Sequence, residues 1–365
     1  MAKGTQPVSL RFLAEQLGLS QGTVSMALSP GALTSGVAAK TRERVLKAAA
    51  ELNYQPNHHA RSLSMGRSYT VGVIMPAISE GYYATLIAGI EERLLDSGYF
   101  FFFTSHHWNE ELVERFPQEL IRRGCEGLIL INTTTSASYS VPYVKIGPGE
   151  GNGRYTNVCL DEERGTRLAL EHLVALGHRN IAFFQGDSES ASTEARWSGI
   201  QKAAKALKIE IRPQLTVRLE LGDKRPSAQD GGIGYRAALE LLERQHPFTA
   251  LLAFNDSSAL GAMRAFQFSG RRVPEDISVV GYDDIPSSAN ERPALTTVHQ
   301  PIQRIGSISA DILLKAINGE VQERTILIEP HMVVRASTTQ PPDALPKRKK
   351  RTLMDRVQSH DRTGL

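Results

Sequence analysis

Two adjacent aspartates at the end of an apolar run are close enough in the sequence to suggest a catalytic pair. Asp283 and Asp284 follow ISVVGY, and two neighbouring carboxylates can act as general acid and general base. Side chains that are adjacent in a strand usually point to opposite sides, so we expect one of the two to bind ligand hydroxyls instead. The sequence also has no phosphate-loop lysine motif, no H-E-x-x-H and no G-x-S-x-G. These features argue against an enzyme.

Three further groups of residues resemble ligand sites, and each is better explained as structure. Residues 147–153, GPGEGNG, do not fit G-x-G-x-x-G and open no evident helix, so they are expected to form a loop. His58 and His59 lack further ligands at the spacing that a metal site needs. Cys125 and Cys159 lie in apolar runs that are predicted to be strands, which suits a reducing cytoplasm. No metal and no cofactor is expected.

Residues 9–28 have the pattern of a helix-turn-helix. Ser9 is the expected N-cap of a first helix, Gly18 permits a left-handed turn, and Ser20 can cap a second helix. Small and apolar residues recur at helical spacing on the inner faces of both helices, as this motif requires. The inner-face residues are Leu10, Leu13, Ala14 and Leu17 in the first helix, and Val24, Ala27 and Leu28 in the second.

Basic residues are concentrated at the two ends of the chain. Residues 1–67 hold eight Lys or Arg against three acidic residues, and residues 341–365 hold seven against three. Because the whole chain has a net charge of +3, the part between them has a net charge of −6. Such an imbalance can arise by chance in short segments, but beside a helix-turn-helix it favours binding to DNA.

The pattern of apolar residues divides the chain into four parts. Residues 1–55 are predicted to form an all-α helix-turn-helix headpiece, and residues 56–68 a hinge helix or linker. In residues 69–340, short apolar runs alternate with amphipathic segments, and the alternation restarts near Asp161. This pattern predicts an α/β core of two doubly wound parallel sheets, with ligands at the carboxyl ends of the strands. Residues 341–365 are predicted to be a disordered basic tail.

Several motifs together resemble the lactose/galactose repressor (LacI/GalR) family of bacterial transcriptional regulators. VSLRFLAEQLGLSQGTVSMALS and KTRERVLKAAAELNYQPNHHARSL resemble the family's N-terminus. EHLVALGHRNIAFFQG, ARWSGI, FNDSSALGAMRAF and VPEDISVVGYDDI resemble its effector domain, in the same order. The resemblance covers residues 8–340. It implies a three-helix headpiece, a hinge helix, and a two-lobed core like that of periplasmic sugar-binding proteins.

The resemblance implies that the second helix reads bases through Gln21, Gly22 and Met26. Gln21 can bind adenine with two hydrogen bonds, Gly22 permits close approach of the backbone, and Met26 can offer apolar contact to a thymine methyl. Hydroxyl groups and the helix N-terminus are expected to contact phosphate. The other residues that the resemblance places on DNA are Leu10, Ser20, Thr23, Ser25, Thr41, Tyr54, Asn57, Ala60 and Leu63.

Two segments that flank the third expected helix need separate interpretation. The loop before it is about three residues longer than in close relatives, and Ala38 replaces a serine, so Thr34 or Ser35 is expected to provide the cap. After this helix, Asn57 can cap a short hinge helix that the family inserts into the minor groove, with Leu63 as the residue that wedges between bases. The alternative is a linker in which Leu63 only packs on the core.

Six core residues are implied as effector contacts. Aromatic rings suit the apolar face of a sugar or a purine, and a guanidinium, an amide and a carboxylate can bind hydroxyls. Asn255 and Asp256 have an alternative role, in which they cap a strand-to-helix turn. Trp197 is expected to lie in the core. The six residues are Tyr82, Tyr83, Arg196, Asn255, Asp256 and Asp283.

The combined interpretation is a cytoplasmic homodimer that binds a near-palindromic double-stranded DNA operator as a repressor, under the control of a small molecule. No apolar run approaches the roughly 20 residues that span a bilayer, and the N-terminus lacks the apolar core of a signal peptide. Ser190 and Ser192 replace an arginine and a threonine of the purine-sensing branch, which favours a sugar effector. An activator, or a purine- or nucleoside-responsive regulator of the same fold, stays open.

Overall fold

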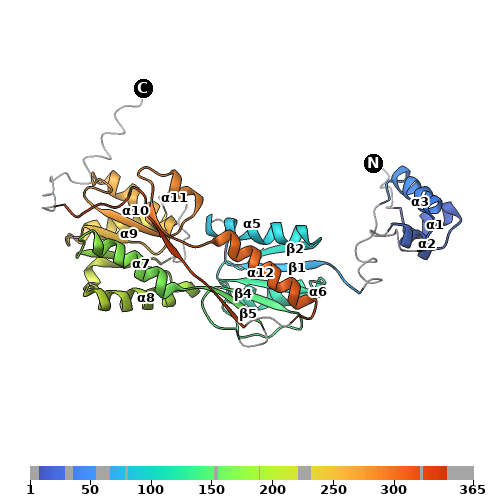
Figure 1. Cartoon of the computed structure of the whole chain (residues 1–365), viewed down its shortest axis with the longest axis horizontal. Helices are drawn as coiled ribbons and strands as arrows, with labels where there is room; N and C mark the ends of the chain where they lie inside the picture. Colours follow the sequence, from blue (N-terminus) through green and yellow to red (C-terminus); the bar gives the residue numbers. More distant parts are fainter. Residues whose placement is uncertain are drawn as a thin grey trace, which may run out of the picture. The chain divides into compact units, whose positions relative to one another are not determined.

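A computed structural model places the elements of the chain (Figure 1). It describes residues 8–28, 36–54, 66–78, 81–151, 155–188, 190–220, 232–320 and 324–342. The chain divides into two compact units, residues 1–69 and residues 70–365, and each is described by itself. The predicted tail after residue 342 and most of the predicted hinge lie outside the described residues. Within the described ranges, no helix has the length and hydropathy to cross a membrane.

Three helices form the first unit, which we call the headpiece. Ser9 accepts a hydrogen bond from the backbone N–H of Phe12, and Gly18 ends the first helix at φ 63°, as the sequence predicts. The Ser20 hydroxyl accepts from the backbone N–H of Thr23 at 3.1 Å, so the predicted second cap is also confirmed. The helices are α1 (Leu10–Leu17), α2 (Gln21–Leu28) and α3 (Ala39–Glu51), and Leu13, Ala14, Val24, Ala27 and Val45 are buried between them.

The third helix begins without a side-chain cap. Ala38 occupies the N-cap position with φ −57° and ψ 138°, and its side chain makes no capping hydrogen bond. The caps that the sequence suggested, Thr34 and Ser35, lie outside the described residues.

A six-stranded parallel sheet forms the first lobe of the core unit. Its strand order is β11-β5-β4-β3-β1-β2, so β2 and β11 are the edge strands. The strands are β1 (Thr70–Met75), β2 (Phe100–Ser105), β3 (Gly127–Ile131), β4 (Tyr143–Ile146), β5 (Thr156–Leu160) and β11 (Thr325–Ile328). The helices of this lobe are α5 (Gly81–Asp96), α6 (Glu110–Arg122) and α12 (Ile302–Ile317).

A second sheet forms the other lobe, in the order β12-β10-β9-β8-β6-β7. Alternate residues of β6 face opposite helix layers: Phe184 packs toward α9 and α10, whereas Phe183 packs toward α7 and α8. The strands are β6 (Ile181–Gln185), β7 (Thr216–Arg218), β8 (Ala250–Leu252), β9 (Ser278–Asp283), β10 (Thr296–His299) and β12 (His331–Val333). The helices are α7 (Glu162–Ala175), α8 (Ala191–Leu207), η2 (Pro213–Leu215), α9 (Ile233–Glu243), α10 (Asp256–Phe268) and α11 (Pro286–Asn290).

The chain passes between the lobes three times, rather than once as a simple restart near Asp161 would require. It crosses after β5, returns after β10 to form α12 and β11, and crosses again after β11 to form β12. Each lobe is therefore built from two separate stretches of sequence. The last strand, β12, pairs antiparallel with β10, which departs from the predicted all-parallel sheet.

Close helix packing holds the returning segment in the first lobe. Helix α12 lies beside α5 (Figure 1), and glycines occupy the crossing. A Cβ on Gly89 would lie 1.9 Å from the carbonyl oxygen of Gln303, and one on Gly306 would lie 2.2 Å from that of Leu86. These two glycines are required because the backbones approach too closely for any side chain.

Two predictions about apolar segments are wrong. Strand β2 is not covered on both faces, since it lies at the edge of its sheet, and Phe100 and Phe102 remain 58% and 39% exposed. Cys125 precedes β3 in a turn instead of lying in a strand, whereas Cys159 is part of β5 as predicted. Both thiols are free and buried.

Candidate functional site

Helix α2 presents a small exposed face that includes all three predicted base-reading positions. Gln21, Gly22 and Met26 are exposed, while Val24 and Ala27 are fully buried on the opposite face. A Cβ on Gly22 would meet only the Ser20 hydroxyl, at 3.8 Å. Nothing in the described part of the headpiece therefore requires glycine at this position.

The other predicted DNA contacts differ in their exposure and in their hydrogen bonds within the headpiece. The Ser20 hydroxyl caps α2 and shares a hydrogen bond of 2.9 Å with the Thr23 hydroxyl. Leu10 and Tyr54 pack partly against the headpiece core. Two further residues, Ser25 and Thr41, are half-buried, and Asn57, Ala60 and Leu63 lie outside the described residues.

A cavity lies between the carboxyl ends of the two sheets of the core. The first lobe contributes residues that follow β1, β2, β3 and β4, and the second contributes residues around β6, β7, β8 and β9. This is where a doubly wound sheet is expected to bind a ligand. The residues used below that line it are Tyr82, Tyr83, Trp108, Asn132, Glu162, Asp187, Ser190, Ser192, Arg196, Leu219, Ile233, Phe254, Asn255, Asp283 and Gln300.

Arg196 provides the cavity's positive charge as half of a buried ion pair. Its Nε and Nη2 each donate to an oxygen of Glu162 at 3.1 Å, and its Nη1 donates to the carbonyl of Phe254. The guanidinium lies 3.7 Å from the ring centroid of Tyr282, whose hydroxyl also donates to Glu162 at 2.7 Å. Burial opposes the charge, but the carboxylate of Glu162 holds the pKa of Arg196 above its ordinary value. Arg196 therefore stays charged and fixed in orientation.

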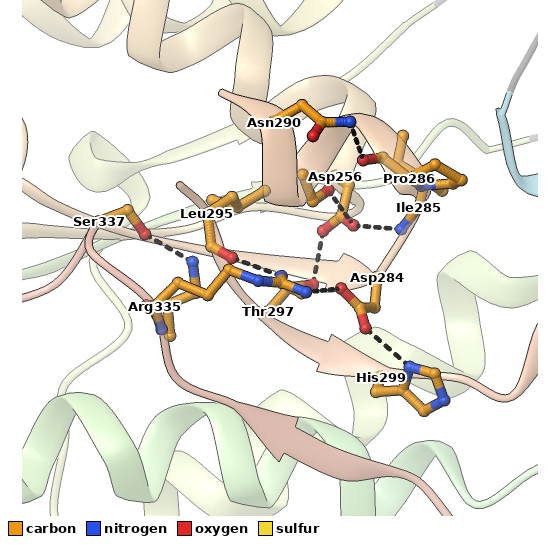
Figure 2. Close-up of polar contacts among 12 residues, drawn as sticks. Asp256, Asp284, Ile285, Pro286, Asn290, Leu295, Thr297, His299, Arg335 and Ser337 are labelled. Carbon is orange, nitrogen blue, oxygen red and sulfur yellow. Dashed lines mark hydrogen bonds and ion pairs between the residues drawn. The ribbon is translucent and has the colours of Figure 1, made fainter. Parts of the chain in front are cut away.

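Asp283 lies in the cavity wall in a strained backbone conformation. Its φ is 122° and that of Asp284 is 60°, so two successive residues leave the ordinary strand region. The Gln300 amide donates to the Asp283 carboxylate at 2.6 Å. Asp284 turns away from this cavity and accepts from Arg335 at 2.6 Å, with His299 Nδ1 at 2.8 Å from its other oxygen (Figure 2). The prediction that the two carboxylates point apart is confirmed.

Two tyrosines and an asparagine form the first lobe's part of the wall. The rings of Tyr82 and Tyr83 meet edge to face at 5.3 Å, and the Asn132 amide donates to the Tyr83 hydroxyl at 3.4 Å. Burial and the nearby Asp283 raise the pKa of Tyr82, so its hydroxyl remains protonated. The side-chain carbonyl of Asn132 is buried and accepts no hydrogen bond from the described residues, which leaves it available to a ligand.

Asp256 is not an effector contact, and this prediction is corrected. Its side chain is fully buried and accepts from the hydroxyl of Ser288 at 2.6 Å. It also accepts from the hydroxyl of Thr297 at 2.5 Å, as Figure 2 shows. It also accepts from the backbone N–H of Ile285 at 2.9 Å, so its oxygens are already used inside the lobe. Asn255 caps α10 in a reciprocal hydrogen-bonded pair with Ser258, and it also lines the cavity.

Sequence reasoning missed several residues of the cavity wall. Asn132 follows directly on the apolar strand β3, Glu162 lies two residues after β5, and Trp108 lies three residues after β2. Their position shortly after a strand could have identified them from the sequence, since the residues after the carboxyl ends of the strands form the site in doubly wound sheets. Trp197 packs edge to face with Phe183 in the core, as predicted. No group of three or more potential metal ligands occurs among the residues that the structure places.

Comparison with known proteins identifies both units. Residues 10–57 match the model for bacterial regulatory proteins of the lacI family, and residues 170–338 match the periplasmic binding protein-like domain. The HTH-type transcriptional repressor PurR of Pasteurella multocida (strain Pm70) is 31% identical over 339 residues, which cover 90% of this chain and 98% of that protein.

Solved structures give the same result. The Lac repressor dimer bound to operator and the anti-inducer ONPF is similar with a TM-score of 0.78 and 32% identity, over 92% of this chain and 100% of that one. The complex of the transcriptional regulator CelR with cellobiose is similar with a TM-score of 0.64 and 29% identity, over 91% and 100%. A helix-turn-helix headpiece on a two-lobed α/β core, together with these relatives, shows that the chain belongs to the lacI family of bacterial regulatory proteins and is a transcriptional regulator rather than an enzyme.

Proposed function

We propose that the protein is a repressor that binds a near-palindromic operator and responds to a small uncharged effector in the cavity of its core. The observation that carries this proposal is the convergence of Arg196, Asp283 and Asn132 on one cavity, beside the rings of Tyr82 and Tyr83. A pre-oriented set of donors and acceptors beside flat rings suits a polyhydroxylated ring with an apolar face. The related repressors favour repression over activation.

On DNA, α2 is proposed to enter the major groove. Gln21 then reads adenine, Met26 contacts a thymine methyl, and Gly22 lets the helix backbone lie close to the bases. The hinge residues Asn57, Ala60 and Leu63 belong to this proposal through the resemblance alone. Two copies of the headpiece are needed for a near-palindromic site, and most of the affinity comes from phosphate contacts.

A sugar is the first candidate effector. Among the described residues of the cavity wall, three carboxylates (Glu162, Asp187 and Asp283) face one guanidinium, that of Arg196, which disfavours phosphorylated or carboxylated ligands. Ser190 and Ser192 also line the cavity and can bind hydroxyls. The complex of CelR with cellobiose is consistent with this choice.

A purine is the second candidate, and a specific observation favours it. The curated relatives at 31% identity are repressors with the name PurR. A purine base would use the same aromatic rings and the same guanidinium, but it offers fewer hydroxyls to the carboxylates. The two candidates therefore differ in how strongly they should depend on Asp283.

Dimer formation in a bacterial cytoplasm is part of the proposal. Phe100 and Phe102 form an exposed apolar surface on the edge strand β2, which a second copy could cover. The Lac repressor in the operator complex is a dimer.

A binding assay on the DNA upstream of the gene tests the proposal. Full-length protein is titrated onto this fragment and onto an unrelated fragment, with glucose, ribose, cellobiose, glucose 6-phosphate or hypoxanthine present. We expect specific binding that weakens with salt, and release by a neutral sugar but not by the phosphate ester. Equal binding to both fragments would refute a sequence-specific repressor, and release by hypoxanthine alone would select the purine candidate.

A further inference from the structure

Trp108 lines the cavity in a position that the proposed contacts leave unused. It follows β2 by three residues, and its side chain is half-buried in the cavity wall. The chain has one other tryptophan, Trp197, which packs on Phe183 in the core. None of the described aromatic pairs includes Trp108, so no described aromatic ring stacks on this indole in the cavity wall.

The backbone that carries Trp108 is strained and firmly held. His107 and Trp108 have φ 52° and 59°, and two successive residues other than glycine in this region are unfavourable. The turn is anchored by hydrogen bonds from the N–H of His106 to Met75 at 3.0 Å and from that of His107 to Pro76 at 2.9 Å. Asn109, next along the chain, caps α6. The surroundings thus impose a conformation that the local sequence would not choose.

His106 fixes the direction of this turn. It is 3% exposed, and its Nδ1 accepts the backbone N–H of Trp108 at 3.1 Å. Thr133 donates its hydroxyl hydrogen to the carbonyl of Ile131, so its oxygen is left to accept from His106 Nε2 at 3.3 Å. Both ring nitrogens are therefore used by a neutral imidazole, and His106 is a positioning residue for Trp108.

Trp108 lies toward the side of the cavity that is farthest from the crossings between the lobes. The three crossings between the lobes leave from β5, β10 and β11, all at one edge of the two sheets, whereas β2 and β7 are the strands at the opposite edges. Residues that follow β2 and β7 therefore lie away from the crossings. Leu219 follows β7 and Ile233 begins α9, and these two residues give the described lining on this side an apolar part. Asp283 ends β9, an interior strand, and supplies polar lining farther in.

We propose that Trp108 is a specificity-determining residue that stacks on the outer ring of a two-ring glycoside, whose inner ring is held by Arg196 and Asp283. This inference rests on the proposed effector-sensing function and names its ligand class, a disaccharide or a nucleoside rather than a single sugar ring. Stacking on an indole adds affinity for the second ring without requiring particular hydroxyls. The inner polar groups then select the first ring.

Matched pairs of compounds test this inference. The pairs are glucose with cellobiose, galactose with lactose, and ribose with inosine, so that the members of each pair share one ring. Full-length protein with Trp197→Phe has Trp108 as its only indole, and its emission is followed during titration together with release from the upstream DNA. We expect one two-ring compound to change the emission and to bind more tightly than its one-ring partner.

Variants at position 108 separate this inference from the proposed function. Trp108→Ala should weaken binding of that two-ring compound about tenfold, Trp108→Phe should restore most of it, and the one-ring partner should bind equally well to all three proteins. His106→Ala should reproduce the loss and change the emission of the unliganded Trp197→Phe protein. A two-ring compound that binds wild type and Trp108→Ala equally well would overturn the role of Trp108 but leave the sensor intact. A wild-type protein that responds to none of the six compounds would overturn both.

Discussion

Arg196 enters the cavity as half of an ion pair, so its charge and its position are settled before a ligand arrives. Glu162 uses both oxygens to hold the guanidinium, and Tyr282 stacks on it. The remaining N–H groups of Arg196 can donate to hydroxyls in a fixed direction. The residue is therefore part of the lobe's structure as well as a proposed ligand contact, and the two roles need different variants to separate them.

The first prediction concerns this ion pair. Arg196→Ala should lower the free energy of unfolding by about 3–5 kcal/mol, because it leaves the buried carboxylate of Glu162 unpaired. The double variant Arg196→Met with Glu162→Gln removes both charges and should be close to wild type in stability. Both proteins should bind the upstream DNA but fail to release it with an effector, as measured by urea unfolding and by DNA titration. A double variant that still responds would exclude Arg196 from the site.

The second prediction concerns His106 and pH. Burial, and secondarily the nearby His107, lower the pKa of His106 from 6.5 to about 4. Between these values the unfolded chain binds a proton that the folded protein does not, so the free energy of unfolding should fall as the pH falls from 6.5 to 4, by about 3 kcal/mol from this residue. His106→Gln should flatten this part of the stability curve relative to wild type, in urea unfolding at several pH values. Parallel curves would contradict the assignment.

Among single residues, the sequence analysis named Arg196 and Asp283, which line the cavity, but it did not name the whole wall. Arg196, inside α8, was named through the family motif ARWSGI, and Asp283 was named because a motif and the end of β9 coincide there. Asp256 has the same apparent signal, but tertiary packing directs its carboxylate to Ser288 and Thr297 instead. Trp108 was missed because its turn is held by contacts from β1 and from His106, which local patterns do not contain.

Among the elements, α2 shows a conflict between stability and recognition. A glycine inside a helix is less favourable than alanine by about 0.8–1.0 kcal/mol. The open space around Gly22 means that the headpiece would accept a methyl group there. We therefore expect Gly22 to serve the proposed close approach of α2 to DNA rather than the stability of the headpiece.

The third prediction follows from this conflict. Gly22→Ala should raise the free energy of unfolding of the headpiece by up to about 1 kcal/mol and should weaken binding to the upstream DNA. Gly18→Ala is the matched control, since Gly18 has φ 63° and alanine there should destabilise the headpiece. Stability is measured by thermal unfolding and affinity by fluorescence anisotropy. If Gly22→Ala binds this DNA as well as wild type, the helix does not need close approach at that point.

Most elements were predictable because apolar runs and helical periodicity mark them in the sequence. The exposure of β2 was not, since four successive phenylalanines read as a buried strand and only the strand order shows that β2 lies at an edge. The antiparallel pairing of β12 and the three crossings between the lobes could not be predicted from the sequence either. Both features depend on pairing between strands that are far apart in the sequence, and the periodicity of apolar residues does not contain that information.

For the whole molecule, the surface of Phe100 and Phe102 should decide whether two copies act together. A dimer that holds two headpieces on one operator gains affinity from the second contact, because that contact forms within one complex. An exposed apolar edge strand in a single copy has no such benefit and favours aggregation.

The fourth prediction tests this surface. Phe102→Glu should shift the protein from dimer to monomer and weaken binding to the upstream DNA about 100-fold or more. Leu327→Glu is the matched control, because Leu327 is 58% exposed on β11, the opposite edge strand of the same sheet. Analytical ultracentrifugation and DNA titration give the two readouts. Retention of the dimer in Phe102→Glu would place the interface elsewhere.

The return of the chain to the first lobe has a consequence for synthesis. Residues 8–54 can fold soon after they leave the ribosome, but the first sheet lacks α12 and β11 until residues 302–328 have been made, and the second lacks β12 until residues 331–333 follow. During translation the reading helices thus exist long before either half of the sensor is complete. A message cut short within the core would therefore yield a protein that has the headpiece helices but lacks a complete effector cavity.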